Sequence, residues 1–413
     1  MKNDLDALML ERDLTAILIT GPGQHNPDMV YMAGGCSLTN ADLIKKRGEQ
    51  AVLFYFPMER DEAAKSGLRT KNLAEYNLSE LLSQTNGDYL KAMVRRYQMM
   101  LAELGISSGK VALYGQSDIG TNYAIFSALQ QELPGLSLVG EINNSALMLA
   151  RMTKDEAEIE RIRRMGKITT QVVDLVADFI TSHSVKDSVM VKPNGDPLTI
   201  GDVKGHINLW LYERGAENPE GTIFSIGHDA GVPHSSGNPE APLELGQTIV
   251  FDIYPCELGG GYFYDFTRTW CLGYAPDNVS ALYETVLSAY NKITTQLEVG
   301  KPFNYYQELI CELFSSQGHP TINDDPQTQN GYVHSLGHGI GLNVHERPWS
   351  GIKSDDKDCL VPGVVFTIEP GLYYPDKGMG VRLENSLWVR PDGKMEVLVD
   401  YPMDLVLPVK TKS

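Results

Sequence analysis

The chain has 413 residues, of which 42% are hydrophobic and 21% are charged, enough apolar material for a sizeable core and two or three domains. Its 35 lysine and arginine residues against 53 aspartate and glutamate residues give a formal net charge of −18. This charge opposes binding to the phosphates of a nucleic acid or to an anionic membrane surface, so we expect neither as a partner.

The N-terminal segment and the cysteine pattern favour a cytoplasmic protein. Residues Met1–Asp6 lack the apolar stretch of a secretory signal, and no apolar run approaches the ~20 residues needed to span a bilayer. The five cysteines are odd in number, scattered and without a CxxC pair. This pattern argues against a disulfide framework and against a thiolate zinc site. We therefore expect a soluble cytoplasmic protein.

The first 150 residues alternate strand-like and helix-like patterns, which is typical of an α/β domain. Short apolar runs predict strands at residues 15–20, 51–56, 110–114 and 136–139. Apolar residues at helical spacing predict helices at residues 89–104 and 121–133. No catalytic group of residues stands out here, so we interpret this region as a structural or substrate-covering domain.

A domain boundary is predicted near residue 150, where a long helix begins. The run Thr153–Glu156 fits a capping box, with Thr153 as the N-cap and Glu156 as the N3 residue. The pentapeptide Lys-Ile-Thr-Thr-Gln occurs at 167–171 and again at 292–296, each time in a helical pattern that precedes glycine-punctuated strands. This repetition favours an internal duplication into two α+β halves.

Two aspartates lie within strongly apolar strand patterns. Asp252 sits inside the run 248–254, whose other members are all β-branched or aromatic. Asp265 lies where the chain returns from a glycine-rich turn at 259–261, which brings it beside Asp252. An unpaired, ionised carboxylate in such a place is costly, or its pKa shifts until it is neutral. These acids therefore need a cation, either a basic side chain or a metal ion.

Two glutamates repeat the pattern further along the chain. Glu369 ends an apolar predicted strand, and in the alternating run 380–389 Arg382 and Glu384 share one face of another. The structural alternative for any one acid is a buried ion pair with an arginine. That alternative fits four acids in separate strands poorly, because Arg268 and Arg382 are the only strand-borne cations nearby.

Histidines complete a set of potential metal ligands. Of the nine histidines, His334, His338 and His345 fall within twelve residues that are interleaved with glycines, and His234 lies in a loop-like stretch. Glycines weaken helices and strands, so this run suits a backbone packed close to a site. Two Asp, two Glu and one His form an oxygen-rich set that suits Mn²⁺ or a similar divalent ion.

The charge of this ligand set favours two metal ions over one. Four carboxylates carry four negative charges, which two divalent cations balance and one does not. Two such ions would lie ~3.5–4 Å apart, share a bridging water and make hydroxide available near neutral pH. The residues alone therefore predict a dinuclear hydrolytic site.

The motifs around these residues closely resemble those of the M24 metallopeptidase family, in its Xaa-Pro aminopeptidase and Xaa-Pro dipeptidase (prolidase) branch. In the family's order they are Val232-Pro233-His234, Asp252 with Gly261–Thr269, Gly337–Glu346, Thr367–Tyr373 and Gly380–Asn385. The N-terminal half resembles the creatinase-type N domain, from Leu14–Thr20 to Met29–Gly34. The resemblance implies an α/β creatinase-like N-terminal domain at 1–150 and an α+β pita-bread catalytic domain of two pseudo-symmetric halves at 151–413.

The resemblance also implies the metal ligands. Asp252 would bind one ion, His338 and Glu369 the other, and Asp265 and Glu384 would bridge both. Glu369 would also carry the proton from the bridging water to the leaving amine. Two divalent ions are thus expected as cofactors, with Mn²⁺ favoured and Co²⁺ or Zn²⁺ as alternatives.

Three histidines and an arginine complete the implied site. His234, His334 and His345 would bind the substrate and stabilise the oxyanion, and His234 and His345 count as catalytic beside Glu369. Arg382 belongs to the substrate-binding group and would orient Glu384. The family also implies a homodimer.

The expected function is that of a dinuclear metallopeptidase. It would use a metal-bridging hydroxide to hydrolyse the Xaa-Pro bond at peptide N-termini or in dipeptides, so its partner is a peptide with proline at the second position. One alternative is a hydrolase of a small non-peptide amide or amidine, but creatinase-type enzymes of that kind lack the ligand set. Another is a non-catalytic pita-bread binding protein, in which we would expect ligand positions to be replaced. A methionine aminopeptidase is disfavoured by the N-terminal domain.

One feature departs from the family pattern. Asp252 and Asp265 are thirteen positions apart, two more than the family predicts. An even insertion in a hairpin keeps the two side chains on the same face, so the metal ligands are unaffected. We expect the longer turn to reshape the substrate entrance and to alter specificity.

Overall fold

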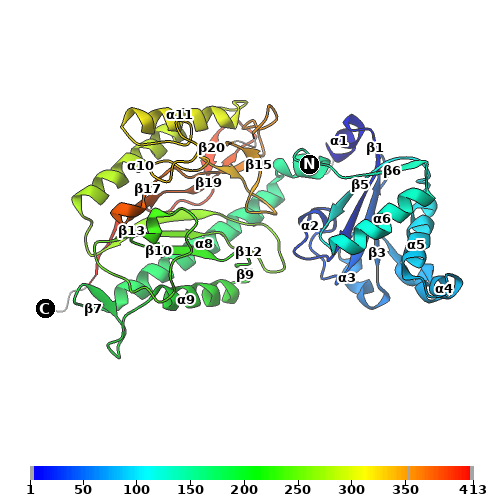
Figure 1. The fold of residues 1–413 in the computed structure, drawn as a ribbon, viewed down its shortest axis with the longest axis horizontal. Coiled ribbons are helices and arrows are strands. Elements are labelled where there is room, and N and C mark those ends of the chain that lie inside the picture. Colours follow the sequence, from blue (N-terminus) through cyan, green and yellow to red (C-terminus); the bar gives the residue numbers. More distant parts are fainter. Residues whose placement is uncertain (1–3, 352–353, 410–413) are drawn as a thin grey trace. The chain divides into compact units, whose positions relative to one another are not determined.

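The computed structural model describes residues 4–351 and 354–409. The chain divides into two compact units, Met1–Arg151 with Gly259–Gly261, and Met152–Leu258 with Tyr262–Ser413, which we call the N-terminal and C-terminal units (Figure 1). None of the helices in these described ranges combines the length and the apolar character that crossing a membrane requires.

A six-stranded sheet in the order β4-β3-β2-β1-β5-β6 forms the centre of the N-terminal unit. Strand β2 is antiparallel to both neighbours, and the other pairings are parallel. The strands are β1 (Leu14–Gly21), β2 (Ala41–Lys46), β3 (Val52–Tyr55), β4 (Arg69–Asn72), β5 (Gly109–Gly115) and β6 (Leu136–Val139). The helices are α1 (Leu5–Glu11), α2 (Pro27–Ala33), α3 (Arg60–Ala64), α4 (Leu78–Gln84), α5 (Tyr89–Glu103) and α6 (Ile119–Glu132), and α7 (Ala146–Met152) ends at the division between the units.

The predicted α/β character of this unit is confirmed, and local sequence explains its elements. Helix α5 begins after Asp88, whose side chain accepts a hydrogen bond from Lys91 N at 3.1 Å. Its apolar face, which includes Met93, joins the same buried cluster as residues of β1 and β3. Strand β2 was not predicted because Asp42 and Lys45 interrupt its apolar pattern, although both are buried.

The C-terminal unit uses one arrangement twice, a pair of helices followed by a sheet. The first half contains α8 (Glu156–Ser182), α9 (Ile200–Glu213), β10 (Thr222–Ile226), β11 (Thr248–Ile253) and β13 (Phe266–Leu272). The second contains α10 (Asp277–Thr295), α11 (Phe303–Ser316), β14 (His338–Gly339), β15 (Glu346–Trp349), β16 (Val365–Ile368), β19 (Asn385–Val389) and β20 (Met395–Val397). The expected two α+β halves are confirmed.

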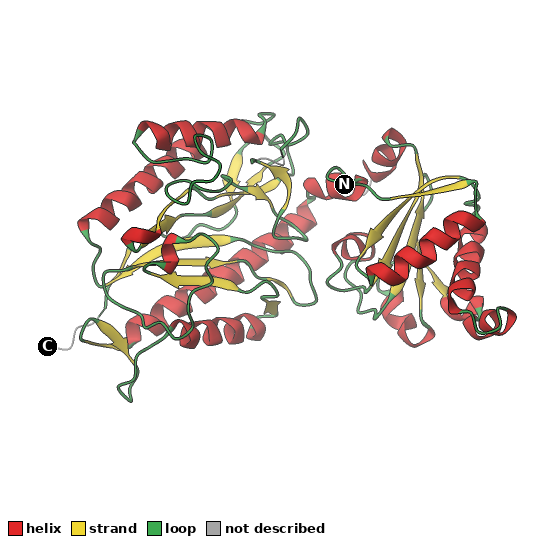
Figure 2. Ribbon diagram, viewed as in Figure 1, coloured by secondary structure: helices red, strands yellow, loops and turns green. Residues whose placement is uncertain are grey.

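The two sheets of this unit have the orders β10-β11-β13-β21 and β15-β14-β16-β19-β20, where β21 is Val406–Leu407. Their strands lie between the pair α8 and α9 and the pair α10 and α11 (Figure 2). Three small two-stranded sheets pair β7 (Ser184–Lys186) with β8 (Val189–Val191), β9 (Ala216–Glu217) with β12 (Cys256–Glu257), and β17 (Gly371–Tyr374) with β18 (Met379–Arg382). The helices thus cover the sheets, and the residues of the buried site lie in the strands or directly beside them.

Helix α8 begins two residues later than the predicted capping box places it, so that prediction was wrong. Asp155 is the N-cap: its side chain accepts from Glu158 N at 3.0 Å, and Glu158 Oε2 accepts from Asp155 N at 2.9 Å. Thr153 instead pairs with Val364 in an antiparallel bridge, which keeps its backbone extended. Two overlapping box patterns occur here in the sequence, and this tertiary pairing selects the second.

The run 380–389 is two strands in different sheets, not the single strand that was predicted. Strand β18 ends at Arg382 and pairs with β17, whereas β19 begins at Asn385 and pairs with β16. Between them, Glu384 N donates to Thr267 O at 3.1 Å. Side chains alternate without interruption through this change of partner, so their pattern alone does not reveal it.

Candidate active site

Strand pairing in the first half brings the two aspartates together. Asp252 in β11 lies opposite Thr267 in β13, and Asp265 precedes Thr267 by two residues. Because side chains alternate along a strand, Asp265 faces the same side as Thr267 and therefore as Asp252. Both carboxylates are buried, with 8% and 4% of their surface exposed, and both line one cavity of about 380 Å³, the first cavity.

The second half contributes His338, Glu369 and Glu384 to the same cavity. His338 opens β14, Glu369 directly follows β16, and Glu384 lies between β18 and β19. Hydrogen bonds from their backbone N–H groups fix the first two: His338 N donates to the Thr367 side chain at Oγ1, 3.1 Å away, and Glu369 N donates to Leu336 O at 2.8 Å. All five sequence-predicted ligands thus come together, two from one half and three from the other.

Glycines beside His338 allow its strand to pack this closely. A Cβ atom on Gly337 would lie 2.0 Å from Thr367 O, and one on Gly339 would lie 1.9 Å from Arg347 O. Backbone carbonyls of packed strands cannot move away cheaply, so no other residue fits. This confirms the interpretation of the glycine-rich run as backbone packed against a site.

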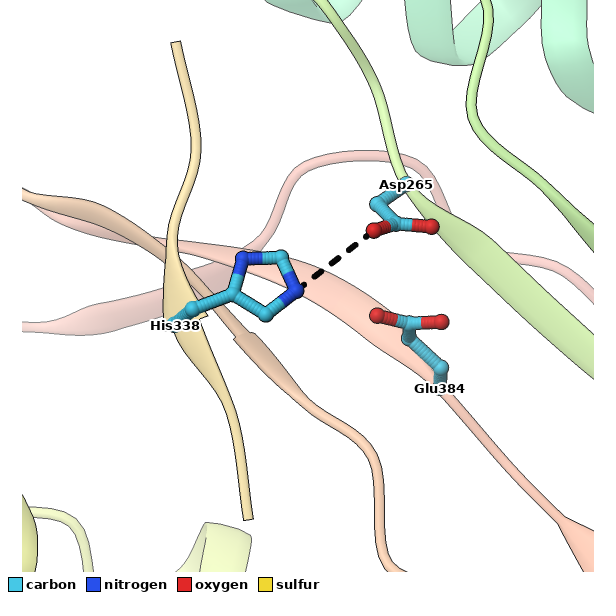
Figure 3. A group of neighbouring side chains, drawn as sticks. All are labelled: Asp265, His338 and Glu384. Carbon is cyan, nitrogen blue, oxygen red and sulfur yellow. Dashed lines mark ion pairs between the residues drawn. The ribbon is translucent and has the colours of Figure 1, made fainter. Parts of the chain in front are cut away.

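Asp265, His338 and Glu384 form the tightest group, in which one potential ligand atom of each lies within 4.8 Å of the others. Figure 3 shows the His338 ring turned toward Asp265, with the Glu384 carboxylate beside them. His338 Nε2 is 3.6 Å from Asp265 Oδ2 and 3.3 Å from Glu369 Oε1. Its Nδ1 lies 3.1 Å from Gly339 O and can donate to it, so Nε2 is the nitrogen that faces the acids. Without metal, Nε2 can carry a proton toward these acids, and a bound metal ion would take the place of that proton.

Burial and mutual repulsion shift the pKa values of these carboxyls. The pKa of Asp265 is raised well above its ordinary value, first by burial and then by the charges of Glu384, Asp252 and Glu369. Burial and the charges of Glu369 and Asp252 likewise raise the pKa of Glu384. Burial also acts to raise the pKa of Glu369, but the hydrogen bond and charge of His338 lower it to about 2. The cluster therefore resists full ionisation unless further cations enter it.

The unpartnered oxygens of this cluster fit a metal. Asp252 Oδ1 and Glu384 Oε1 are buried and have no hydrogen-bond donor among the residues that the structure describes. Buried polar atoms normally have a partner, and leaving a carboxylate oxygen without one is costly. Carboxylates with an imidazole are a donor set that suits a divalent ion such as Mn²⁺. The residues present therefore fit a divalent metal ion, with Asp265, His338 and Glu384 as the group that could hold it.

Arg382 pairs with Asp252, where the resemblance implied Glu384. Its guanidinium is buried; Nη2 donates to Asp252 Oδ2 at 2.6 Å, and Nη1 donates to the Tyr373 hydroxyl at 2.8 Å. Thr267 Oγ1 accepts from Arg382 Nε at 3.3 Å and donates to Glu384 Oε2 at 2.7 Å. The hydrogen bonds of Arg382 therefore reach Glu384 through this threonine, and its charge also acts on Glu384 directly.

Arg268 does not neutralise any of the four acids. Its guanidinium is fully buried and donates to the backbone oxygens of Thr267, Glu384, Tyr401 and Pro402 and to Asn385 Oδ1. The structure therefore does not give each acid its own arginine: Arg382 forms an ion pair with Asp252, and among the described residues none of the other three acids forms an ion pair with an arginine.

The remaining predicted site residues lie around the cluster. His234 and His345 line both the first cavity and a second cavity of about 370 Å³, whereas His334 lines only the second. The ring of His345 lies 4.2 Å from that of His338, centroid to centroid. His334 Nε2 is 2.9 Å from the Tyr373 hydroxyl, and burial lowers the pKa of His334. The ring nitrogens of these imidazoles can exchange hydrogen bonds with a bound molecule.

Two functional candidates were missed from the sequence. Thr267 joins Glu384 to Arg382, and the Tyr373 hydroxyl joins Arg382 to His334. Both lie inside the motifs already quoted, Thr267 two residues after Asp265 in the chain. Their position in the motifs was the available signal, but their hydrogen-bond partners are far away in sequence and appear only in the fold.

The buried acids and imidazole give this pita-bread-like unit a site of the metal-binding class. The model of metallopeptidase family M24 matches residues 160–391, more than half of the chain, and the chain belongs to this family. It is 29% identical to the Xaa-Pro dipeptidase of Pyrococcus furiosus over 244 residues, which are 59% of this chain and 62% of that protein. It is 24% identical to the Xaa-Pro dipeptidase of Pyrococcus horikoshii over 395 residues, 95% of this chain and 92% of that protein.

Solved structures show the same fold over the whole chain. The prolidase from Pyrococcus horikoshii OT3 matches with a TM-score of 0.72 at 21% identity, covering 98% of this chain and 99% of that chain. The X-Pro aminopeptidase from Thermotoga maritima MSB8 matches with a TM-score of 0.71 at 22% identity, covering 95% and 97%. The expected fold class is confirmed: an N-terminal α/β domain precedes a pita-bread catalytic domain.

Proposed function

We propose that this protein is a dinuclear metallopeptidase that cleaves the bond before proline in dipeptides or at peptide N-termini. The observation that carries the proposal is the pair of buried, unpartnered oxygens, Asp252 Oδ1 and Glu384 Oε1, within a cluster of four acids. Membership of family M24 and the likeness to Xaa-Pro dipeptidases and an X-Pro aminopeptidase support the reaction and the proline preference. Residues 1–150 would form the creatinase-like N-terminal domain, and residues 151–413 would form the catalytic domain that carries the site.

The five ligands divide between two ions as the resemblance implies. Asp252 would bind one, His338 and Glu369 the other, and Asp265 and Glu384 both. Two divalent ions, preferably Mn²⁺, balance the four carboxylates. When bound, such a pair activates water and polarises the carbonyl of the scissile bond.

The chain's own residues would position the substrate and move the proton. Glu369, whose pKa is lowered, is an ionised carboxylate that can accept a proton from the attacking water and pass it to the leaving amine. His234 and His345 line both cavities, where an imidazole N–H can donate to the substrate carbonyl oxygen as it gains charge. Arg382, bonded to Asp252 Oδ2, holds that carboxylate in one orientation.

The test is a metal-dependent peptide series on one preparation. Protein stripped with a chelator is reloaded with Mn²⁺, Co²⁺ or Zn²⁺, its metal content is measured, and it is assayed on Ala-Pro, on longer Ala-Pro peptides and on matched Ala-Ala peptides. We expect two ions per chain, activity only after reloading, and cleavage only before proline. Activity that survives chelation contradicts the mechanism. Cleavage of small amides without any Xaa-Pro cleavage would support the alternative hydrolase instead.

A further inference from the structure

The candidate site consists of two cavities that meet at its centre. The first and second cavities share His234, His338, His345, Glu369 and Arg382. Beyond this shared part, the first cavity extends along Lys204 and Glu220, and the second extends along Trp349 and Gly351. A peptide that is cleaved at the centre has groups on both sides of the scissile bond. The residues that line the unshared parts of the two cavities would therefore determine substrate specificity.

Lys204 is the distinctive residue of the unshared part of the first cavity. It lies in the first turns of α9 and is half-buried, and its Nζ donates to Ser236 O at 2.5 Å. No acid within residues 4–351 and 354–409 forms an ion pair with it. An ammonium has three N–H donors, so two remain for a ligand.

The charges around Lys204 make its lack of an acidic partner informative. The chain has 53 acidic residues against 35 basic ones, so a lysine has many acids available. The other cation of the first cavity, Arg382, is already bonded to Asp252. Glu220 lines the same cavity but is exposed and not paired with Lys204. Burial lowers the pKa of Lys204, because a half-buried ammonium loses part of its hydration. A substrate carboxylate that reaches Nζ would replace this lost hydration with a charge-assisted hydrogen bond.

We propose that Lys204 binds a carboxylate of the substrate and so makes the enzyme selective for anionic peptides. This inference rests on the proposed peptidase function and assigns the substrate class of that site. In a peptide with proline second, the carboxylate is either the side chain of an acidic first residue or the free C-terminus of a dipeptide. Both sources have the same chemistry, and the experiment separates them.

Two substrate pairs distinguish the sources. The first pair is Glu-Pro-Ala-amide against Gln-Pro-Ala-amide, and the second is Ala-Pro against Ala-Pro-amide. We expect the wild-type enzyme to favour the carboxylate in one pair by about tenfold or more in kcat/KM, as a hydrogen bond to a charged group allows. Lys204→Met should abolish that preference, Lys204→Arg should keep most of it, and Lys204→Glu should transfer it to Lys-Pro-Ala-amide. The control Lys167→Met removes an exposed lysine from α8 and should preserve it.

A binding measurement keeps this inference separate from the proposed function. Dissociation constants of the same peptides are measured by calorimetry in a Glu369→Gln background with and without Lys204→Met, after circular dichroism has shown that the variants are folded. We expect Lys204→Met to weaken binding of the carboxylate partner only. Equal affinity for both members of each pair, or a preference that survives Lys204→Met and Lys204→Glu, overturns the inference. A wild-type enzyme that cleaves no Xaa-Pro peptide refutes the proposed function, while the binding data still decide the role of Lys204.

Discussion

Two carboxylates of this site, those of Asp252 and Glu384, each have one oxygen that accepts a hydrogen bond and one that has no donor among the described residues. Thr267 Oγ1 donates to Glu384 Oε2, and Arg382 Nη2 donates to Asp252 Oδ2. Within the described part of the chain, the second oxygen of each is buried and unpartnered. The donors fix the orientation of each carboxylate, and the free oxygen is left for a cation.

Thr267→Val tests this supporting role, because valine has the same shape but no hydroxyl. We expect metal affinity to fall by about 10–100-fold, as when an outer partner of a ligand is lost. The control is Thr269→Val in the same strand, because Thr269 Oγ1 donates to Arg382 O and accepts from Arg382 N, both at 2.9 Å, and so bonds to backbone instead of to a carboxylate. It should reduce thermal stability but leave metal affinity near wild type. Equal metal affinities of the two variants, measured by competition with a chelator, would contradict the role of Thr267.

Glu369→Gln separates metal binding from proton transfer. The amide keeps an oxygen that can face a metal, but it cannot accept a proton. We therefore expect most of the metal to remain while kcat falls by ~10²–10⁴-fold. Elemental analysis and steady-state kinetics on one preparation measure both quantities. Turnover near the wild-type rate would remove Glu369 from the proton-transfer step.

His338→Ala tests the assignment of ions to ligands. His338 is the only imidazole in the tight group with Asp265 and Glu384, and it also lies 3.3 Å from Glu369. Its loss should deplete the ion that it shares with Glu369 and leave one ion per chain in place of two. Unchanged stoichiometry by elemental analysis would refute the assignment of His338 as a ligand.

At the scale of the elements, sequence periodicity predicted the regular parts of the fold and failed where tertiary partners decide. The helix predicted at 89–104 is α5, and the strand predicted at 248–254 is β11. The change of sheet between β18 and β19 was missed because Glu384 keeps the side-chain alternation while its backbone bonds to Thr267, 117 residues away in the chain. Hydrogen-bond partners at that separation leave no local trace in the sequence.

The start of α8 gives a stability prediction of its own. Asp155→Ala removes the side chain that caps Glu158 N and should lower the free energy of unfolding by about 1 kcal/mol. Thr153→Ala, at the N-cap position that the sequence first predicted, should change it by less than about 0.5 kcal/mol. Urea unfolding followed by circular dichroism compares the two. A larger loss at Thr153 than at Asp155 would contradict the cap seen in the structure.

For the molecule as a whole, the sequence predicted which residues form the candidate site better than it predicted how they support one another. Apolar strand patterns identified Asp252, Asp265 and Glu369, because burying an ionised carboxylate among apolar residues is costly unless a cation lies beside it. The partner of Arg382 was not predictable, since the Asp252 carboxylate that it binds is 130 residues away and is reached by packing of β11 against β18. Composition and motif identify ligands, but only packing shows what orients them.

The raised pKa values predict how pH affects the metal-free protein. Asp265 and Glu384 have folded-state pKa values above their ordinary values of 3.8 and 4.5. Between the ordinary pKa values and the raised ones, the unfolded chain has released protons that the folded chain still retains. The free energy of unfolding of the metal-free protein therefore falls as the pH rises through this window. Bound metal replaces those protons and removes the loss. Added Mn²⁺ should therefore raise the melting temperature more at pH 7 than at pH 5, and an equal increase at both would contradict this.

The division of the ligands between two halves has a consequence for folding. Asp252 in β11 and Asp265 directly before β13 belong to the first half, and His338, Glu369 and Glu384 lie in or beside strands of the second half. Neither half on its own holds all five proposed ligands, so two bound metal ions would link the two halves. The apoprotein should open between these halves more readily than the loaded form, and metal supply would then govern how long the enzyme survives proteolysis.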